Sequence, residues 1–522
     1  MVTDMNFLDM QIMWNRLIAV TGEQAKTLIR TAFSTIVREC EDISAGVFDL
    51  RGRMIAQAVT GTPGHINSMA ESVKHFIARF PLDTMKEGDA YITNDPWMGT
   101  GHLNDFVITT PAFHKGRLVA LFSCTSHLMD VGGMGVSTEA DDVHMEGLYI
   151  PILKLIDRGQ VDEVLMEIIK ANSRLPVETE GDVYSLVACN ETGARALSKM
   201  MDEFELESID ALADFVLTRS EDAVRKSIAA LPKGSWSYGM VTDGYDDPIE
   251  LAAQLTVSDN GIHVDFAGTS QSIRKGINVP LSYTTAYSVF GLGCVVAPDV
   301  PNNAGSLLPF TISAPAGTIL NAIKPAPVAS RHVIGQMLPD VVFGCLRQAL
   351  PDRVPAEGAS ALWNVTVRGR HKTDAAEEKP FALSITMNGG TGARPTKDGL
   401  SATAFPSGVH GTQVEIAEIQ APIVVWKKEL RIGSGGNGRM RGGDGQVVEM
   451  SGRDGTAFDL LASFDRVVYP ARGAQGGDDG AAGAIRLKSG KPIRAKGVTR
   501  IDADDRLILL TPGGGGLGDA TH

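Results

Sequence analysis

The chain has 522 residues, of which 43% are hydrophobic and 21% are charged, and its formal net charge is −14. This length exceeds what one compact core usually holds, so we expect two or three domains. The acidic excess, with no basic run between aromatic residues, argues against nucleic acid and anionic membranes as partners.

The N-terminal segment shows none of the features of a secretory signal. Asp4 and Asp9 stand where a signal would be basic, and no small-residue cleavage site follows. No apolar run is as long as a membrane span. The five cysteines are scattered without CxxC spacing, which is typical of reduced thiols. We therefore expect a cytoplasmic protein.

The first half of the chain alternates between helical and strand patterns. The spacing of apolar residues predicts helix over 5–40, a hairpin over 45–58, a loop over 61–69 and a short helix over 70–80. A strand is predicted within 89–96, and two buried strands over 106–113 and 116–126. Residues 160–232 then read as helical.

The pattern changes at Pro232-Lys233-Gly234, which we take as the domain boundary. Beyond it, residues 249–268 alternate around an Asn-Gly turn and predict a hairpin. Residues 332–350 predict a helix, and from 380 onward glycine is dense. The fold class is therefore mixed α/β (α+β). A metal-binding α/β domain over 1–235 is followed by a β-rich, glycine-rich domain over 236–522 with an embedded helix.

The segment "TNDPWMGTGHLNDF" (93–106) places His102 three residues before Asp105, at the start of a predicted strand. The next strand ends at His127, with Asp130 three residues later, so two adjacent strands would each bring an imidazole and a carboxylate to one sheet edge. Such ligands suit a divalent transition metal. A further carboxylate could come from Glu39, Glu41 or Asp42. The alternative is structural, with hydrogen-bonded histidines and with Asp130 capping the "VGGMG" turn.

Many ordered motifs resemble the hydantoinase B/oxoprolinase family, whose members are similar to one subunit type of the acetone and acetophenone carboxylases. The resemblance runs nearly end to end. It rests on "TAFSTIVRECEDISAGVFDLRGRMIAQ", "GHINSM", "TNDPWMGTGHLNDF", "SHLMDVGG", "STEADDVHMEGLYIP", "DFAGTSQ", "VPNNAGSLLPFTISAPAGTILNA", "ELRIGSGGNGRMRGGDG" and "TPGGGGLGD".

The resemblance implies a site. Its metal ligands would be His102, Asp105, His127 and a carboxylate of the N-terminal acidic segment, which we assign to Asp42, with Glu41 and Glu39 as the other candidates. Asp130 would orient an imidazole or shuttle a proton, and His144 would act beside the site. The chain departs from the family at Leu128, where a second His is usual. His65 and Glu146 lie in matching segments and could face the site or be structural.

The resemblance also implies a function. The chain would be the B-type subunit of an ATP-dependent cyclic-amide hydrolase, with one divalent metal (Mn, Fe or Zn). ATP and Mg would bind to an A-type partner, in a heterotetramer of two A and two B chains. We assign no ATP site to "RMRGGDG" or "TPGGGGLGD", because tight turns explain these glycines better than a phosphate loop. The alternatives are a subunit of a ketone carboxylase and a non-catalytic scaffold for the A-type subunit.

Overall fold

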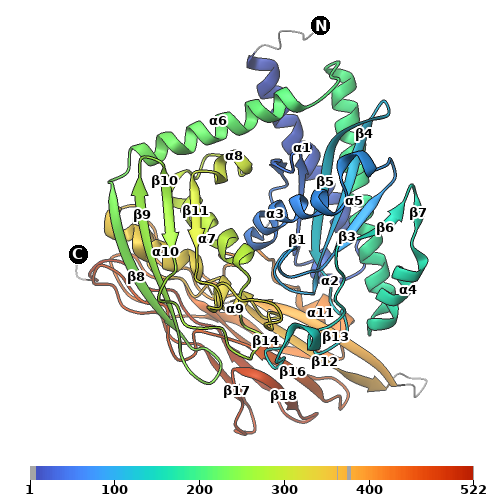
Figure 1. The fold of residues 1–522 in the computed structure, drawn as a ribbon. Coiled ribbons are helices and arrows are strands. Elements are labelled where there is room, and N and C mark those ends of the chain that lie inside the picture. The colour runs from blue at the N-terminus through green and yellow to red at the C-terminus, as the bar shows by residue number, and fades with distance from the viewer. Residues whose placement is uncertain (1–6, 61, 361, 373–377, 521–522) are drawn as a thin grey trace.

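The computed structural model describes residues 7–60, 62–360, 362–372 and 378–520 (Figure 1). Its first half, up to residue 235, is built on a seven-stranded antiparallel sheet in the order β2-β1-β5-β4-β3-β6-β7. The strands are β1 (Ile43–Phe48), β2 (Met54–Gln57), β3 (Ala90–Thr93), β4 (Asp105–His114), β5 (Arg117–His127), β6 (Leu153–Asp157) and β7 (Gln160–Val161). The hairpin and the three strands predicted for this half are confirmed.

Helices cover both faces of this sheet, which explains why β4 and β5 are buried over nearly their whole length. Successive strand side chains point to opposite faces. Phe106 packs with residues of α1 (Phe7–Thr31) and α5 (Pro176–Glu203) on one face, whereas Val107 packs with residues of α3 (Pro63–Arg79) on the other. The short helix α2 (Thr35–Arg38) leads from α1 into β1, and η1 (Leu82–Thr84) follows α3.

Two more helices complete the predicted helical stretch, α4 (Glu163–Asn172) and α6 (Asp210–Ala229). In Figure 1, α6 runs from the first half to β8 (Gly234–Thr242) of the second. The predicted boundary near 235 thus falls where helix gives way to strand. Among the described residues, no helix combines the length and the apolar character that crossing a membrane requires.

The described residues of the second half form three four-stranded sheets. The first has the order β11-β10-β9-β8, with β9 (Ile249–Ser258), β10 (Gly261–Asp265) and β11 (Phe310–Ser313); the predicted hairpin is β9–β10. The second has the order β13-β12-β16-β18, with β12 (Trp363–Lys372), β13 (Glu378–Met387), β16 (Phe458–Ser463) and β18 (Lys496–Ile501). The third has the order β14-β15-β19-β17, with β14 (Ile423–Arg431), β15 (Gly445–Gly452), β17 (Ala484–Leu487) and β19 (Leu507–Leu510).

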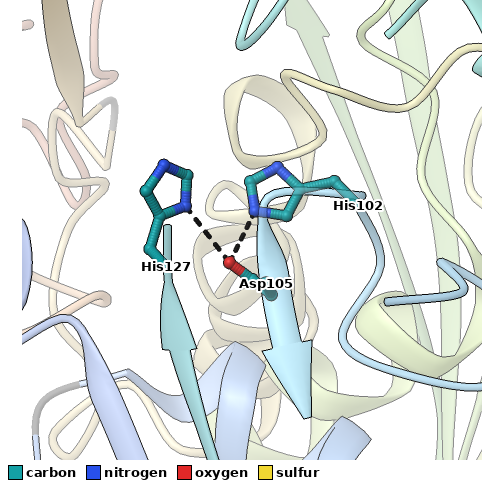
Figure 2. A group of neighbouring side chains, drawn as sticks. All are labelled: His102, Asp105 and His127. Atoms are coloured by element: carbon teal, nitrogen blue, oxygen red, sulfur yellow. Dashed lines mark hydrogen bonds and ion pairs between the residues drawn. The ribbon is translucent and has the colours of Figure 1, made fainter. Parts of the chain in front are cut away.

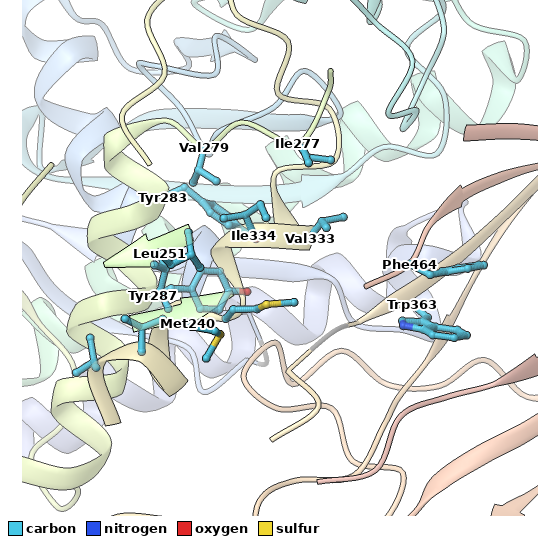
Figure 3. Packing of buried hydrophobic residues seen from close by; sticks show 14 of the residues in the cluster. Met240, Leu251, Ile277, Val279, Tyr283, Tyr287, Val333, Ile334, Trp363 and Phe464 are labelled. Carbon is cyan, nitrogen blue, oxygen red and sulfur yellow. The ribbon is translucent and has the colours of Figure 1, made fainter. Parts of the chain in front are cut away.

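Helices join these sheets through one continuous apolar core. They are α7 (Leu281–Val296), α8 (Ala304–Leu307), α9 (His332–Gly335), α10 (Leu338–Ala349) and α11 (Val414–Gln420). The core runs from Tyr283 and Tyr287 on α7 to Trp363 and Phe464, whose rings stack with centroids 4.5 Å apart (Figure 3).

Two local predictions were wrong in detail, and one helix was missed. The loop predicted over 61–69 is largely the start of α3, which begins at Pro63, because proline is favoured in the first helical turn. The helix predicted over 332–350 is two helices, α9 and α10. Helix α7 was not predicted, because it is apolar almost all round and rich in glycine and aromatic residues, so it lacks an amphipathic period.

The glycine-rich segments of the second half are packed against one another and do not form simple tight turns. Gly514 donates its backbone N–H to Gly443 at 3.0 Å and accepts from Gly436 at 2.9 Å. None of the glycines 513–516 has the left-handed φ that would explain glycine by conformation. A Cβ on Gly514 would instead lie 2.0 Å from the Thr391 carbonyl oxygen. Glycine is needed here because four backbone segments lie closer together than any side chain permits.

Gly514→Ala is therefore expected to lower stability by more than about 4 kcal/mol, or to abolish folding, because no backbone carbonyl can move aside cheaply. Gly22→Ala is the matched control, since Gly22 lies inside α1 and a Cβ there would have nothing within 4 Å; it is expected to stabilise α1 by about 0.5–1 kcal/mol. Thermal and urea unfolding of both variants would measure this. A Gly514→Ala variant with the melting temperature of the wild type would show that close backbone packing does not require glycine at this position.

Candidate metal centre

His102, Asp105 and His127 meet at one end of the central strand pair of the first half (Figure 2). Asp105 opens β4, His127 ends β5, and the antiparallel register places them directly opposite each other. His102 lies in the preceding loop. Each residue offers one ligand atom, and these atoms all lie within 4.8 Å of one another. All three side chains are buried. The predicted meeting of the two strand ends is thus confirmed for His102, Asp105 and His127.

One oxygen of Asp105 is occupied by donors from three different parts of the chain. Oδ2 lies 2.5 Å from Nη2 of Arg331, 2.9 Å from the hydroxyl of Thr100 and 2.9 Å from Nε2 of His65. Burial alone would raise the pKa of Asp105. The neighbouring His102, His65 and Arg331 outweigh this effect and hold that pKa well below its usual range. The carboxyl group is therefore ionised.

The other oxygen of Asp105 faces the two imidazoles. Oδ1 lies 2.7 Å from Nε2 of His102 and 3.1 Å from Nδ1 of His127, and both rings point at it in Figure 2. One oxygen of the carboxylate thus pairs with Arg331, and the other faces the two imidazoles.

The hydrogen bonds of His102 limit what can lie between these groups. Nδ1 lies 2.8 Å from the carbonyl oxygen of Ala329, which can only accept, so Nδ1 carries the hydrogen. Nε2 faces an oxygen of the ionised Asp105 at 2.7 Å, so a proton or a metal cation has to lie between the two atoms. Burial and then the charge of Arg331 lower the pKa of His102 to about 4, which disfavours the proton. The position therefore suits a metal cation, and a hydrogen bond from the second ring nitrogen is usual for metal-bound histidine.

Of the three candidate acidic residues, Asp42 lines the small cavity beside the cluster, although its carboxylate is not among the ligand atoms that lie within 4.8 Å of one another. Asp42 directly precedes β1, and its carbonyl accepts the backbone N–H of His127 at 3.2 Å. Its carboxylate accepts the Thr62 hydroxyl at 2.9 Å. Glu41 is instead 3.9 Å from His410.

Glu39, the remaining candidate, pairs with Arg38 at 3.4 Å. Neither Glu39 nor Glu41 lines the small cavity at the cluster. This cavity measures about 30 Å³, which is enough to hold a water molecule. It is lined by Asp42, Thr62, His65, His102, His127, Tyr283, Arg331, His332, Gln336, Leu362, Asn364, Ser407 and Val409.

His65 lies on α3 and bridges the two acidic residues of the cavity. Its Nε2 contacts Asp105, and its Nδ1 is 3.4 Å from Asp42. Burial would lower the pKa of His65, but the charges of Asp105 and Asp42 outweigh it and raise that pKa. Of the two roles left open for His65, the structure therefore supports the one at the site.

The second half supplies residues that sequence reasoning missed. Arg331 is buried, donates its Nε–H to the Thr100 carbonyl at 2.8 Å, and lies over the ring of Tyr283 with Cζ 4.1 Å from the centroid. A Cβ on Gly101 would be 2.6 Å from Arg331, and one on Gly64 would be 2.6 Å from Tyr283. Gly101 and Gly64 therefore leave room for the side chain of Arg331 and the ring of Tyr283.

His332 also lines the cavity, and burial followed by the charge of Arg331 lowers its pKa to about 3. The only sequence signal for both residues is "SRHVIG" (330–335), which fits the start of a core helix equally well.

The structure does not bring Asp130 or His144 into the cluster. Asp130 accepts from Nη1 of Arg174 at 2.6 Å and from the backbone N–H of the same residue. His144 is exposed on the short helix η2 (Val143–Met145). Leu128, where the family usually has His, is fully buried in the apolar core.

A sequence model of the family described as Hydantoinase B/oxoprolinase matches residues 6–520. A protein of Pseudomonas sp. strain NS671, provisionally named as the B-type subunit of a D-/L-hydantoinase, is 29% identical over 99% of this chain and 91% of its own length. The ATP-dependent caprolactamase of Pseudomonas jessenii superposes with a TM-score of 0.90 at 25% identity, over 99% of this chain and 92% of that one. An acetone carboxylase chain shares the fold with a TM-score of 0.84 at 18% identity, over 98% and 75% of the two chains.

The pair formed by Arg331 and Asp105 gives a prediction about stability. Arg331→Met leaves an ionised carboxylate buried with fewer donors, so we expect a loss of about 3–5 kcal/mol in urea unfolding. Arg331→Met combined with Asp105→Asn is expected to lose less than the sum of the two single changes.

Arg500→Met is the matched control, because Arg500 pairs with Asp459 at a similar distance of 3.0 Å on the surface. There we expect a loss of no more than about 1 kcal/mol. Equal losses of stability in the two variants would show that the buried Arg331–Asp105 pair stabilises the fold no more than a surface pair does.

Proposed function

Because the chain belongs to the hydantoinase B/oxoprolinase family, we propose that it is the B-type subunit of an ATP-dependent hydrolase of cyclic amides. The observation that carries the proposal is the buried His102–Asp105–His127 cluster, in which two imidazoles face one oxygen of an ionised carboxylate. The likeness to a caprolactamase supports a lactam or related cyclic amide as substrate.

The metal would be held by His102, Asp105, His127 and Asp42. Two nitrogen and two oxygen donors accept Mn, Fe or Zn alike. Such an ion polarises a carbonyl-type oxygen and lowers the pKa of a bound water.

The chain's own residues prepare this site. Arg331 and Thr100 fix the carboxylate plane of Asp105, so that Oδ1 points at the ligand position. The Ala329 carbonyl holds His102 in the tautomer with a free Nε2. His65 keeps a proton between Asp42 and Asp105 and limits the repulsion between the two carboxylates.

We place ATP, with Mg, in an A-type partner. An amide is a poor electrophile, and transfer of a phosphoryl group to its oxygen creates a good leaving group. The glycine-rich segments of this chain use their N–H groups on one another, as Gly514 does with Gly443, so they do not present them to a phosphate. The provisional name of the Pseudomonas relative, which makes it one subunit of a hydantoinase, supports a partner. We propose two A and two B chains in the complex.

The experiment is an assay of the complex co-purified with its ATP-binding partner. Hydantoin, N-methylhydantoin, 5-oxoproline and caprolactam are supplied with ATP, and acetone is supplied with ATP and bicarbonate. We expect ATP-dependent ring opening of at least one cyclic amide, without need for bicarbonate. Turnover of acetone alone would replace the hydrolase by a ketone carboxylase, which shares the fold.

His102→Ala is expected to lower ring opening by at least about 100-fold, because even loss of a ligand's outer partner typically costs 10–100-fold. His75→Ala is the matched control, since His75 is exposed on the outer face of α3 and is expected to leave the rate unchanged. Full activity of the His102→Ala variant in an intact complex would favour the alternative that this chain is a non-catalytic scaffold for the A-type subunit.

The acidic segment gives a finer prediction. Asp42→Asn is expected to reduce ring opening about as strongly as His102→Ala, because Asp42 lines the cavity. Glu41→Gln and Glu39→Gln are expected to keep nearly full rates, since both side chains pair elsewhere. A loss confined to Glu41→Gln or Glu39→Gln would assign the fourth ligand differently.

A further inference from the structure

The segment from Val131 to Leu148 leaves the first sheet after β5 and docks on loops of the second half. The backbone N–H of Val143 donates to the carbonyl of Pro325 at 2.9 Å. The carbonyl of Thr138 accepts from the N–H of Gly276 at 2.9 Å. This segment therefore connects the end of β5, where His127 lies, with the loop that leads to Arg331.

Glu146 adds a buried side-chain connection to these backbone contacts. Its side chain is 1% exposed. Oε1 accepts the backbone N–H groups of Val328 at 2.6 Å and Ala329 at 2.7 Å. Two adjacent N–H groups on one oxygen fix the direction of the peptide that joins them. Without an acceptor, each buried N–H would carry an uncompensated desolvation cost.

The backbone that Glu146 holds supplies two contacts to the metal cluster. The carbonyl of Ala329 accepts from Nδ1 of His102 at 2.8 Å. Two residues later, Arg331 reaches Oδ2 of Asp105. The tautomer of one ligand and the orientation of another thus depend on a loop whose conformation is set by a side chain that touches neither ligand.

We propose that Glu146 is a positioning residue of the metal centre. By holding the Val328–Ala329 peptide, it keeps Nε2 of His102 free as a ligand and keeps Arg331 on the far oxygen of Asp105. This inference rests on the proposed metal-dependent function. It differs from the role expected for His144, two residues earlier, whose side chain is exposed to solvent.

Substitutions at Glu146 separate this role from general stability. Glu146→Gln keeps an acceptor oxygen at the same place. Burial raises the pKa of Glu146 to about 8, so a neutral amide also matches its charge near pH 7. Glu146→Leu keeps the bulk and removes the acceptor. Glu146→Asp keeps the carboxyl and withdraws it by one methylene, which gives a second test if the Leu variant does not fold.

The matched control is Glu139→Gln on the same segment. Glu139 bonds Tyr245 and Lys275 of the second half but not the Val328–Ala329 peptide. The probe is Co²⁺ alone, added to the metal-depleted full chain, with its Kd measured by chelator competition and its d–d absorption spectrum recorded. Hydrogen exchange of peptides that cover 326–332 reports the loop without any metal.

We expect the wild type, Glu146→Gln and Glu139→Gln to share one Co²⁺ spectrum and Kd values within about threefold. Glu146→Leu and Glu146→Asp are expected to bind Co²⁺ about 10–100-fold more weakly, with a changed spectrum and faster exchange in 326–332. Wild-type affinity and spectrum in a folded Leu or Asp variant would overturn the proposal.

The two hypotheses fail differently. If the wild type binds no Co²⁺, the metal-dependent function is wrong, and the positioning of a metal by Glu146 is wrong with it. Exchange in 326–332 would then still show whether Glu146 holds the loop. If the wild type binds Co²⁺ and the loop exchanges equally fast in all variants, the metal centre stands and Glu146 has no positioning role.

Discussion

A fully buried carboxylate is the constraint around which this molecule is arranged. Asp105 has no exposed surface, so each of its oxygens needs partners from the protein or from a bound cation. Oδ2 receives them from Arg331, Thr100 and His65, and Oδ1 faces two imidazoles. The register between β4 and β5, the start of α3 and the loop before α9 all serve to bring these groups to one carboxyl group.

This arrangement makes one site out of two halves of the chain. The ligand candidates come from the first half, whereas the cation that neutralises Asp105 and the carbonyl that orients His102 come from residues 329–331. A buried ion pair contributes little net stability, because desolvation offsets most of its attraction. Its effect here is geometric, since the Arg331 contact leaves Oδ2 unable to turn toward the ligand position. Glu146 contacts the backbone just before Arg331, because its carboxyl group accepts the N–H groups of Val328 and Ala329.

Much of this could be predicted from the sequence wherever the signal was local. The HxxD spacing at a strand start and His127 at the end of the next strand were enough to predict that they meet, because hairpin-connected strands pair. From the sequence, the identity of the fourth ligand could be narrowed only to three acidic residues, one of which is Asp42. The backbone at Glu41 is left-handed, with φ near 53°, so neighbouring carboxylates lie in different surroundings. No sequence pattern predicts this turn.

Contacts between distant segments were not predictable in this way. Arg331 lies 226 positions from Asp105, and no local period links them. Asp130 follows His127 closely, yet its carboxylate accepts from the backbone N–H and the guanidinium of Arg174, so nearness in sequence was misleading. The glycines at 513–516 suggested turns, because a requirement for close backbone packing and a requirement for positive φ look the same in a sequence.

The central claim is that a divalent cation lies between His102, Asp105 and His127. The most direct measurement is the metal content of the purified chain, by mass spectrometry, beside a His102→Ala/His127→Ala variant, together with anomalous diffraction from crystals. We expect about one divalent ion per wild-type chain, none in the variant, and an anomalous peak beside Oδ1 of Asp105. Near-zero metal in both, from folded chains with their partner bound, would contradict it.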